Sequence, residues 1–189
     1  MQNLNSSWNT FKGLIATPEL PYLGPTPRSS RLPLADLNRK LDGFIQDTQL
    51  APGLQPLIRS AALLWHDHLD ESHAISQNIH NAEGSFLHAI MHRREPDYGN
   101  AKYWFHRVGQ HASFAGIATR ARCVLESKVG TGLASKLVPH GRWDSFAFVD
   151  ACQATAAQPP ADATAQVLRL IQEVEFSELL SRIFSEYYG

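Results

Sequence analysis

Apolar residues recur every three or four positions through most of the chain, which is the spacing that places them on one face of an α-helix. From residue 34 onward this spacing is carried by Leu34, Leu37, Leu41, Phe44 and Ile45. The strict alternation of apolar and polar residues that marks a half-buried strand is absent from this stretch. The pattern therefore predicts an all-α protein.

A second helical pattern follows a break at Pro52 and Pro56. It runs from Ile58 to Ile79 and predicts one long helix of about six turns. A short helix is predicted to begin at Gly84 and to stop before Pro96, because the residue that precedes a proline disfavours the α conformation.

The later helices are predicted mainly from their end signals. The last helix changes register near Glu175, which indicates either a kink or a change of packing partner. The remaining predictions are a helix capped by Asp97 and ended by Gly109, a helix over Ser113 to Val129, a loop from Gly130 to Gly141, and two final helices capped by Asp144 and Asp162.

The first 33 residues differ from the rest because they are rich in proline, which removes a backbone donor and fixes φ. Four apolar residues at helical spacing are expected to pin this segment to the body: Trp8, Phe11, Leu14 and Ile15. We therefore expect a single helical-bundle-like domain of about six or seven helices over residues 34–189, preceded by an ordered N-terminal arm, residues 1–33, that belongs to the same fold.

Composition narrows the classes of partner. The 189 residues include 17 basic and 18 acidic side chains, for a formal net charge of -1, so the cationic excess that binds nucleic acid or anionic lipid is absent. No apolar run approaches the roughly 20 residues that span a bilayer, and the start lacks the pattern of an export signal. We expect a cytoplasmic protein with no nucleic-acid or membrane partner; the sequence leaves the oligomeric state open.

Histidines are concentrated in one region: eight of the nine lie between His66 and His111. On a continuous helix, spacings of four, three and four place His66, Asp70, His73 and Gln77 on one flank. His68 falls in the apolar stripe, where a hydrogen-bonded core histidine is the expected role.

His88 and His92 stand four residues apart, so both imidazoles can reach one metal ion. Two ligands do not complete a site, and a third is expected from the preceding helix, with His73, His66 and Asp70 as the candidates. Glu95 and Asp97 are candidates for a further ligand or a catalytic base. The pattern is not H-E-x-x-H, because Ala89 stands where that motif has its glutamate.

Arg93 and Arg94 follow directly, and they have two interpretations. They can balance the dipole at the end of a helix, or one of them can grip the carboxylate or phosphate of a ligand. Asn100 and Tyr103 are candidates to line the same pocket, whereas the neighbouring aromatic residues of that helix are expected in the core.

Two resemblances rest on this region. The stretch from His88 to Phe105, together with Leu64-Trp65 and the segment Asp70 to His73, resembles an uncharacterised family of bacterial and fungal proteins, and this resemblance implies no activity. The segment that starts at Asp97 also resembles a single helical hairpin of the Sel1 and tetratricopeptide type. One such unit is present, whereas a stable array needs about three.

The functional prediction is a small-ligand or divalent-metal site between adjacent helices, with zinc, manganese or iron as the candidate ions. In the metal version the ion activates water for hydrolysis. In the metal-free version a histidine acts as acid or base on an anionic substrate. The alternative is a non-catalytic helical module that binds a protein segment, so the sequence leaves open whether the protein is an enzyme.

Overall fold

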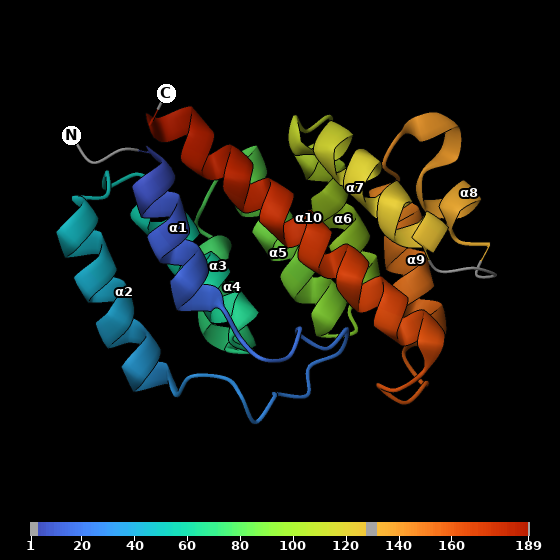
Figure 1. Ribbon diagram of the computed structural model, residues 1–189, viewed down its shortest axis with the longest axis horizontal. Helices are drawn as coiled ribbons and strands as arrows, with labels where there is room; N and C mark the ends of the chain where they lie inside the picture. The colour runs from blue at the N-terminus through green and yellow to red at the C-terminus, as the bar shows by residue number, and fades with distance from the viewer. Residues whose placement is uncertain (1–3, 128–131, 189) are drawn as a thin grey trace.

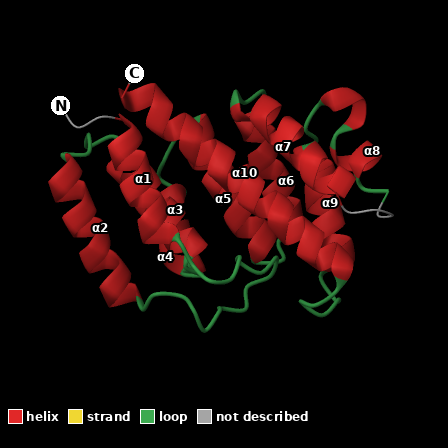
Figure 2. Ribbon diagram, in the orientation of Figure 1, coloured by secondary structure: helices red, strands yellow, loops and turns green. Residues whose placement is uncertain are grey.

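The computed structural model describes residues 4–127 and 132–188, and every regular element in these ranges is helical (Figure 2). The elements are α1 (Leu4–Ile15), α2 (Leu34–Thr48), α3 (Gln55–Trp65), α4 (Leu69–Ser76), α5 (Ala82–Arg94), α6 (Tyr98–Val108), α7 (Ser113–Ser127), α8 (Ala134–Leu137), the 3-10 turn η1 (Pro139–Gly141), α9 (Ser145–Thr155) and α10 (Ala163–Tyr188). The all-α prediction is confirmed, but the described chain forms more helices than six or seven.

One additional helix arises because the predicted long helix is broken. α3 ends at Trp65 and α4 begins at Leu69, and between them Asp67 takes a left-handed φ of 63°. The N–H of His68 donates to the carbonyl of Leu63, and the N–H of Asp67 donates to that of Leu64. These two bonds form a Schellman C-terminus, a motif that usually carries glycine at the left-handed position. The apolar spacing continues across the break, which is why periodicity alone missed it.

Two more helices lie where the sequence predicted irregular chain. The predicted arm begins with α1, and only residues 16–33 are irregular. The predicted loop 130–141 contains α8 and η1, with Leu137 fully buried; its first two residues lie outside the described ranges, as does Val129 at the end of the helix predicted over 113–129.

The predicted end signals are confirmed at three helices. The side chain of Asp97 accepts from the Asn100 N–H at 3.1 Å, that of Asp144 from the Ala147 N–H at 2.9 Å, and that of Asp162 from the Ala165 N–H at 3.0 Å. Gly109 ends α6 with a φ of 63°. Each such cap stabilises its helix by about 1 kcal/mol.

α5 occupies the centre of the molecule. Every residue from Gly84 to Arg94 is buried, and the helix contacts α3, α4 and α6. Phe86 is fully buried against Phe105, a burial that contributes about 2–3 kcal/mol. The polar side chains of α5 are therefore held away from water and depend on other protein groups for hydrogen bonds and charge pairing.

α10 runs across the molecule from α1 at one end to α9 at the other (Figure 1). It is one continuous helix that contacts α1, α7 and α9, so its packing partner changes along its length, as the register slip near Glu175 suggested. At its C-terminal end, Phe184 packs against Trp8 and Phe11 of α1, which confirms that apolar residues pin the N-terminal segment. None of the helices in the described ranges is long and apolar enough to cross a membrane.

Candidate metal centre

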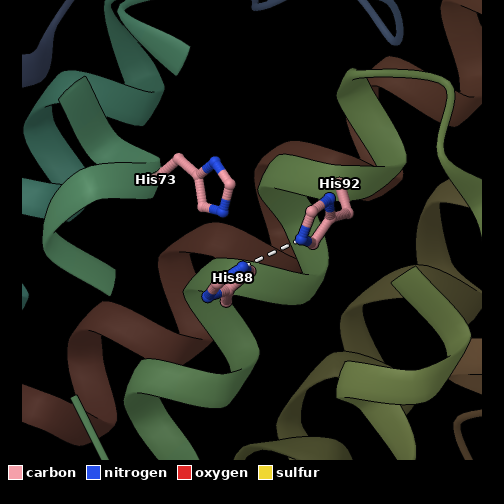
Figure 3. A group of neighbouring side chains, drawn as sticks. All are labelled: His73, His88 and His92. Carbon is pink, nitrogen blue, oxygen red and sulfur yellow. Dashed lines mark hydrogen bonds between the residues drawn. The ribbon is translucent and has the colours of Figure 1, made fainter. Parts of the chain in front are cut away.

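Three histidines meet between α4 and α5, and their rings point toward one another (Figure 3). The i, i+4 spacing of His88 and His92 places both on one face of α5, with ring centroids 4.6 Å apart. His73 of α4 meets them edge-on, with centroid distances of 4.8 Å to His88 and 5.1 Å to His92. The predicted meeting of His73 with the pair on the next helix is therefore present in the structure.

The ring nitrogens are close enough to share one ion. The Nε2 atoms of His88 and His92 lie 2.8 Å apart, and one potential ligand atom from each of the three residues lies within 4.8 Å of the other two. Two imidazole nitrogens bound to one ion at about 2.1 Å lie roughly 3.0–3.4 Å apart. The two Nε2 atoms are hydrogen-bonded to each other at 2.8 Å, so a small separation of the rings would let both bind one cation.

Burial sets the charge state of this pair. His88 and His92 are 2% and 5% exposed, whereas His73 is half-buried. Burial, followed by the neighbouring imidazoles of His92 and His73, lowers the pKa of His88 to about 4. Burial and then His73 also lower the pKa of His92, although Asp97 raises it. Both rings are neutral near pH 7, the form that binds a metal ion.

Carboxylates lie on the far side of His92. Glu95 Oε2 is 3.3 Å from Nδ1 of His92, and Asp97 Oδ2 is 4.0 Å from the same atom. Burial raises the pKa of Glu95, His73 lowers it, and the nearby charges of Asp70 and Asp97 raise it. Because Glu95 faces Nδ1 while Nε2 faces His88, its position suits orienting the ring more than the predicted role of base.

Trp104 is a part of the site that the sequence did not reveal. Its ring stacks on His88 with a centroid distance of 4.0 Å and an interplanar angle of 15°. The apolar spacing of α6 predicted this residue in the core, together with Phe105. Phe105 is indeed buried, but Trp104 is half-buried and fixes the plane of a candidate ligand.

His66 lies in a different environment, because the break after α3 removes it from the flank that it was predicted to share. Its Nδ1 accepts from the N–H of Leu32 at 3.2 Å, and its Nε2 donates to the Leu14 carbonyl at 3.3 Å. His68 is the buried, hydrogen-bonded histidine that was predicted, and it donates to the Leu32 carbonyl at 2.9 Å. Both rings bind the N-terminal segment, so the candidate metal centre consists of His73, His88 and His92.

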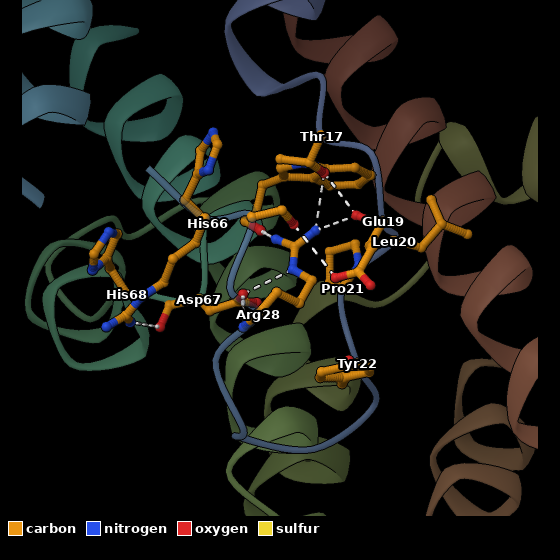
Figure 4. A network of polar contacts seen from close by, with 12 residues as sticks. Thr17, Glu19, Leu20, Pro21, Tyr22, Arg28, His66, Asp67 and His68 are labelled. Carbon is orange, nitrogen blue, oxygen red and sulfur yellow. Dashed lines mark hydrogen bonds and ion pairs between the residues drawn. The ribbon is translucent and has the colours of Figure 1, made fainter. Parts of the chain in front are cut away.

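Arg28 organises this neighbouring region (Figure 4). Its buried guanidinium donates from Nε to Asp67 at 2.8 Å and also contacts the carbonyls of Glu19 and Trp65. Asp67 accepts from Arg94 Nη2 as well, at 2.6 Å. This network ties the irregular segment 16–33 to the break between α3 and α4.

The two arginines after His92 are interior residues. Arg93 is 0% exposed and pairs with Glu175 of α10, while Arg94 is 1% exposed and pairs with Asp67. Protein carboxylates already occupy both guanidinium groups, so the structure does not support the prediction that they grip a ligand anion. Their partners, 82 and 27 residues away, leave no local signal in the sequence.

The other predicted site residues are spread over the surface. Asp70 and Gln77 are exposed on α4 and just beyond its end, and Asn100 is half-buried. Tyr103 is 53% exposed, and its hydroxyl accepts from Arg107 at 3.4 Å. Of these, Asp70 is the one whose charge acts on a residue beside the histidines, Glu95.

Comparison with known proteins adds no relative from which a role can be carried over. No family model matches the chain, and no curated protein or solved structure is significantly similar to it.

Proposed function

We propose that the protein binds one divalent transition-metal ion through His73, His88 and His92 and uses it in a hydrolytic reaction. The observation that carries the proposal is the convergence of three imidazoles in which two buried, neutral rings place their Nε2 atoms 2.8 Å apart. Imidazole is a common ligand of zinc and iron, and the candidate ions are zinc, manganese and iron.

Three protein ligands leave a coordination position for water, as in catalytic zinc sites. An ion held by these residues would activate a water molecule for hydrolysis near neutral pH. The half-buried His73 would complete the set by a rotation of its ring, because the ligand atoms are within 4.8 Å of one another rather than at roughly 3 Å.

The surrounding residues have distinct roles in this proposal. Glu95 Oε2, 3.3 Å from Nδ1 of His92, is placed to accept the Nδ1 proton after a small rotation, which would keep the Nε2 lone pair directed at the ion. Trp104 covers one face of His88 and fixes its plane. Asp70, exposed on the same helix as His73, is the candidate for a base or a fourth ligand.

Metal content after incubation with zinc, manganese or ferrous iron tests the binding step. We expect close to one ion per chain in the wild type and its loss in His73→Gln, whose half-buried side chain is the ligand least needed for folding. His80→Gln is the matched control, because this exposed histidine lies outside the cluster. Equal metal content in all three proteins would refute the proposed site.

Hydrolysis is tested separately with chromogenic carboxylic and phosphoric esters. The metal-loaded wild type should turn over at least one ester class, and His73→Gln should lose this activity while His80→Gln keeps it. Metal binding without turnover would support the metal site and refute the hydrolytic function.

The protein-binding module stays an alternative. Within the described ranges the large hydrophobic side chains with substantial exposure are Tyr103 and Phe146. A protein-docking groove usually presents a continuous apolar patch of several hundred Å². Two exposed rings do not make such a patch, so the convergence of the histidines favours the metal site over the protein-binding module.

A further inference from the structure

A second candidate binding site lies away from the histidine centre, where the surface opens into a cavity of about 970 Å³. Its walls come from the end of α6, the start of α7 and the segment 139–146 that leads into α9. This volume falls in the range of small-molecule sites.

The wall is rich in hydrogen-bond donors. Arg142, His106 and His140 line the cavity with exposed side chains, and the structure shows no ion pair for any of them within residues 4–127 and 132–188. The carboxylate in the wall, that of Asp144, is engaged as the cap of α9. Asp144 keeps its negative charge, but it already accepts a backbone N–H, whereas the guanidinium of Arg142 has no partner among the described residues and can pair with an anionic group of a ligand.

Trp143 lines the same wall and has an unsatisfied donor buried behind it. It is 7% exposed, and its indole Nε1 has no hydrogen-bond partner among the residues that the structure describes. An unpaired buried donor is destabilising, and a water or a ligand group that reached it would supply the acceptor.

The shape of the cavity depends on unusual backbone. Gly109, His140 and Gly141 all line it and have φ values of 63°, 51° and 76°. Of the three, His140 is the non-glycine residue, so its left-handed backbone is strained, and strain of this kind is concentrated at functional sites. The turn through His140 and Gly141 is what leads the chain to Arg142.

Apolar surface completes the lining. Phe146 is 39% exposed and Phe114 is half-buried, and both face the cavity with ring carbons available for contact. We propose that this cavity binds a small organic anion whose phosphate or carboxylate head group pairs with Arg142 and whose apolar body packs on Phe146. The site is independent of the histidine centre.

Titration of the chelator-treated protein with phenyl phosphate and with benzoate tests this proposal and separates the two head groups. The readout is the indole N–H resonance of Trp143 in ¹⁵N–¹H spectra, assigned by its disappearance in Trp143→Phe. At least one probe should shift this resonance saturably at millimolar concentration, whereas neutral benzyl alcohol should bind roughly tenfold more weakly or not at all.

Arg142→Gln should weaken the probe roughly tenfold, because the guanidinium supplies charge and paired donors. Its matched control is Arg122→Gln, an exposed arginine of α7 outside the cavity wall, which should bind the probe as the wild type does. Phe146→Ala should weaken phenyl phosphate more than it weakens inorganic phosphate. An unchanged affinity in Arg142→Gln, or equal binding of the neutral alcohol, overturns the proposal.

Discussion

Glu175→Gln removes the counter-ion of a guanidinium that has no access to water. Glu175 accepts from Arg93 at 2.6 Å and 3.2 Å, and both residues are 0% exposed. Other neighbours of the guanidinium are the ring of Phe148, at 4.3 Å, the ring of Phe105, at 5.9 Å, and Gln172, at 3.5 Å. None of them carries the negative charge that the substitution removes.

The size of the effect follows from this geometry. Breaking one side of a buried ion pair costs about 3–5 kcal/mol, because the other charge stays desolvated without compensation. We expect about 3 kcal/mol for Glu175→Gln, since the glutamine oxygen still accepts one of the two hydrogen bonds. A loss of this size is a large part of the 5–15 kcal/mol that stabilises a typical domain.

Urea unfolding followed by far-ultraviolet circular dichroism at pH 7 measures this loss. With a urea dependence of about 1–3 kcal/mol per molar, the midpoint should fall by roughly 1–3 M. The control is Glu173→Gln on the same helix, whose partly exposed carboxylate is 3.8 Å from Arg120 and should contribute less than about 1 kcal/mol.

The double variant Arg93→Met with Glu175→Leu separates charge from shape. It replaces both ions by apolar side chains, and such replacements of buried pairs are often neutral or stabilising. We therefore expect it to be clearly more stable than Glu175→Gln. The reasoning fails if Glu175→Gln costs no more than Glu173→Gln, or if the double variant is as unstable as the single one.

Three further outcomes are expected. In chelator, the pKa of His88 is near 6.5 in the unfolded chain but about 4 in the folded protein. The free energy of unfolding should therefore be highest above pH 6.5 and fall by roughly 3 kcal/mol as the pH falls toward 4. His88→Phe should flatten this pH dependence, and an unchanged slope would contradict the assignment. Asp67→Asn should lower the free energy of unfolding by about 3 kcal/mol and speed proteolysis within residues 16–33, because the carboxylate binds both Arg28 and Arg94. Cleavage at the wild-type rate would argue against this tether. Gly84→Ala should lower the free energy of unfolding by about 1–3 kcal/mol, since a Cβ there would lie 2.5 Å from the Ile79 carbonyl and side chain; thermal unfolding at the wild-type midpoint would show that the turn can relax.

The sequence predicted the parts of the fold that depend on local chemistry. Helical spacing and the caps at Asp97, Asp144 and Asp162 are decided within one or two turns, and all three caps are present. The break after Trp65 could not be predicted in this way, because it depends on Asp67 in a left-handed conformation that distant arginines help to hold.

The same distinction applies to the candidate site. Spacing predicted the i, i+4 pair His88 and His92 and left His73, His66 and Asp70 as alternatives for the third residue; the structure brings His73 to the pair. The covering ring of Trp104 depends on how α6 packs against α5, which spacing within one helix does not specify. For Arg93 the signal was two cations next to two anions, whereas its actual partner, Glu175, lies in another helix.

The pairing of Arg93 with Glu175 also determines when the protein can finish folding during its synthesis. The two residues are 82 positions apart, and at about 5–20 residues per second the ribosome needs several seconds to add the second after the first. Throughout this interval the nascent chain has an arginine that cannot be withdrawn from water. The buried pair can therefore form only after the first half of α10 has been made, although the contacts of α5 with α3, α4 and α6 involve residues that precede α10.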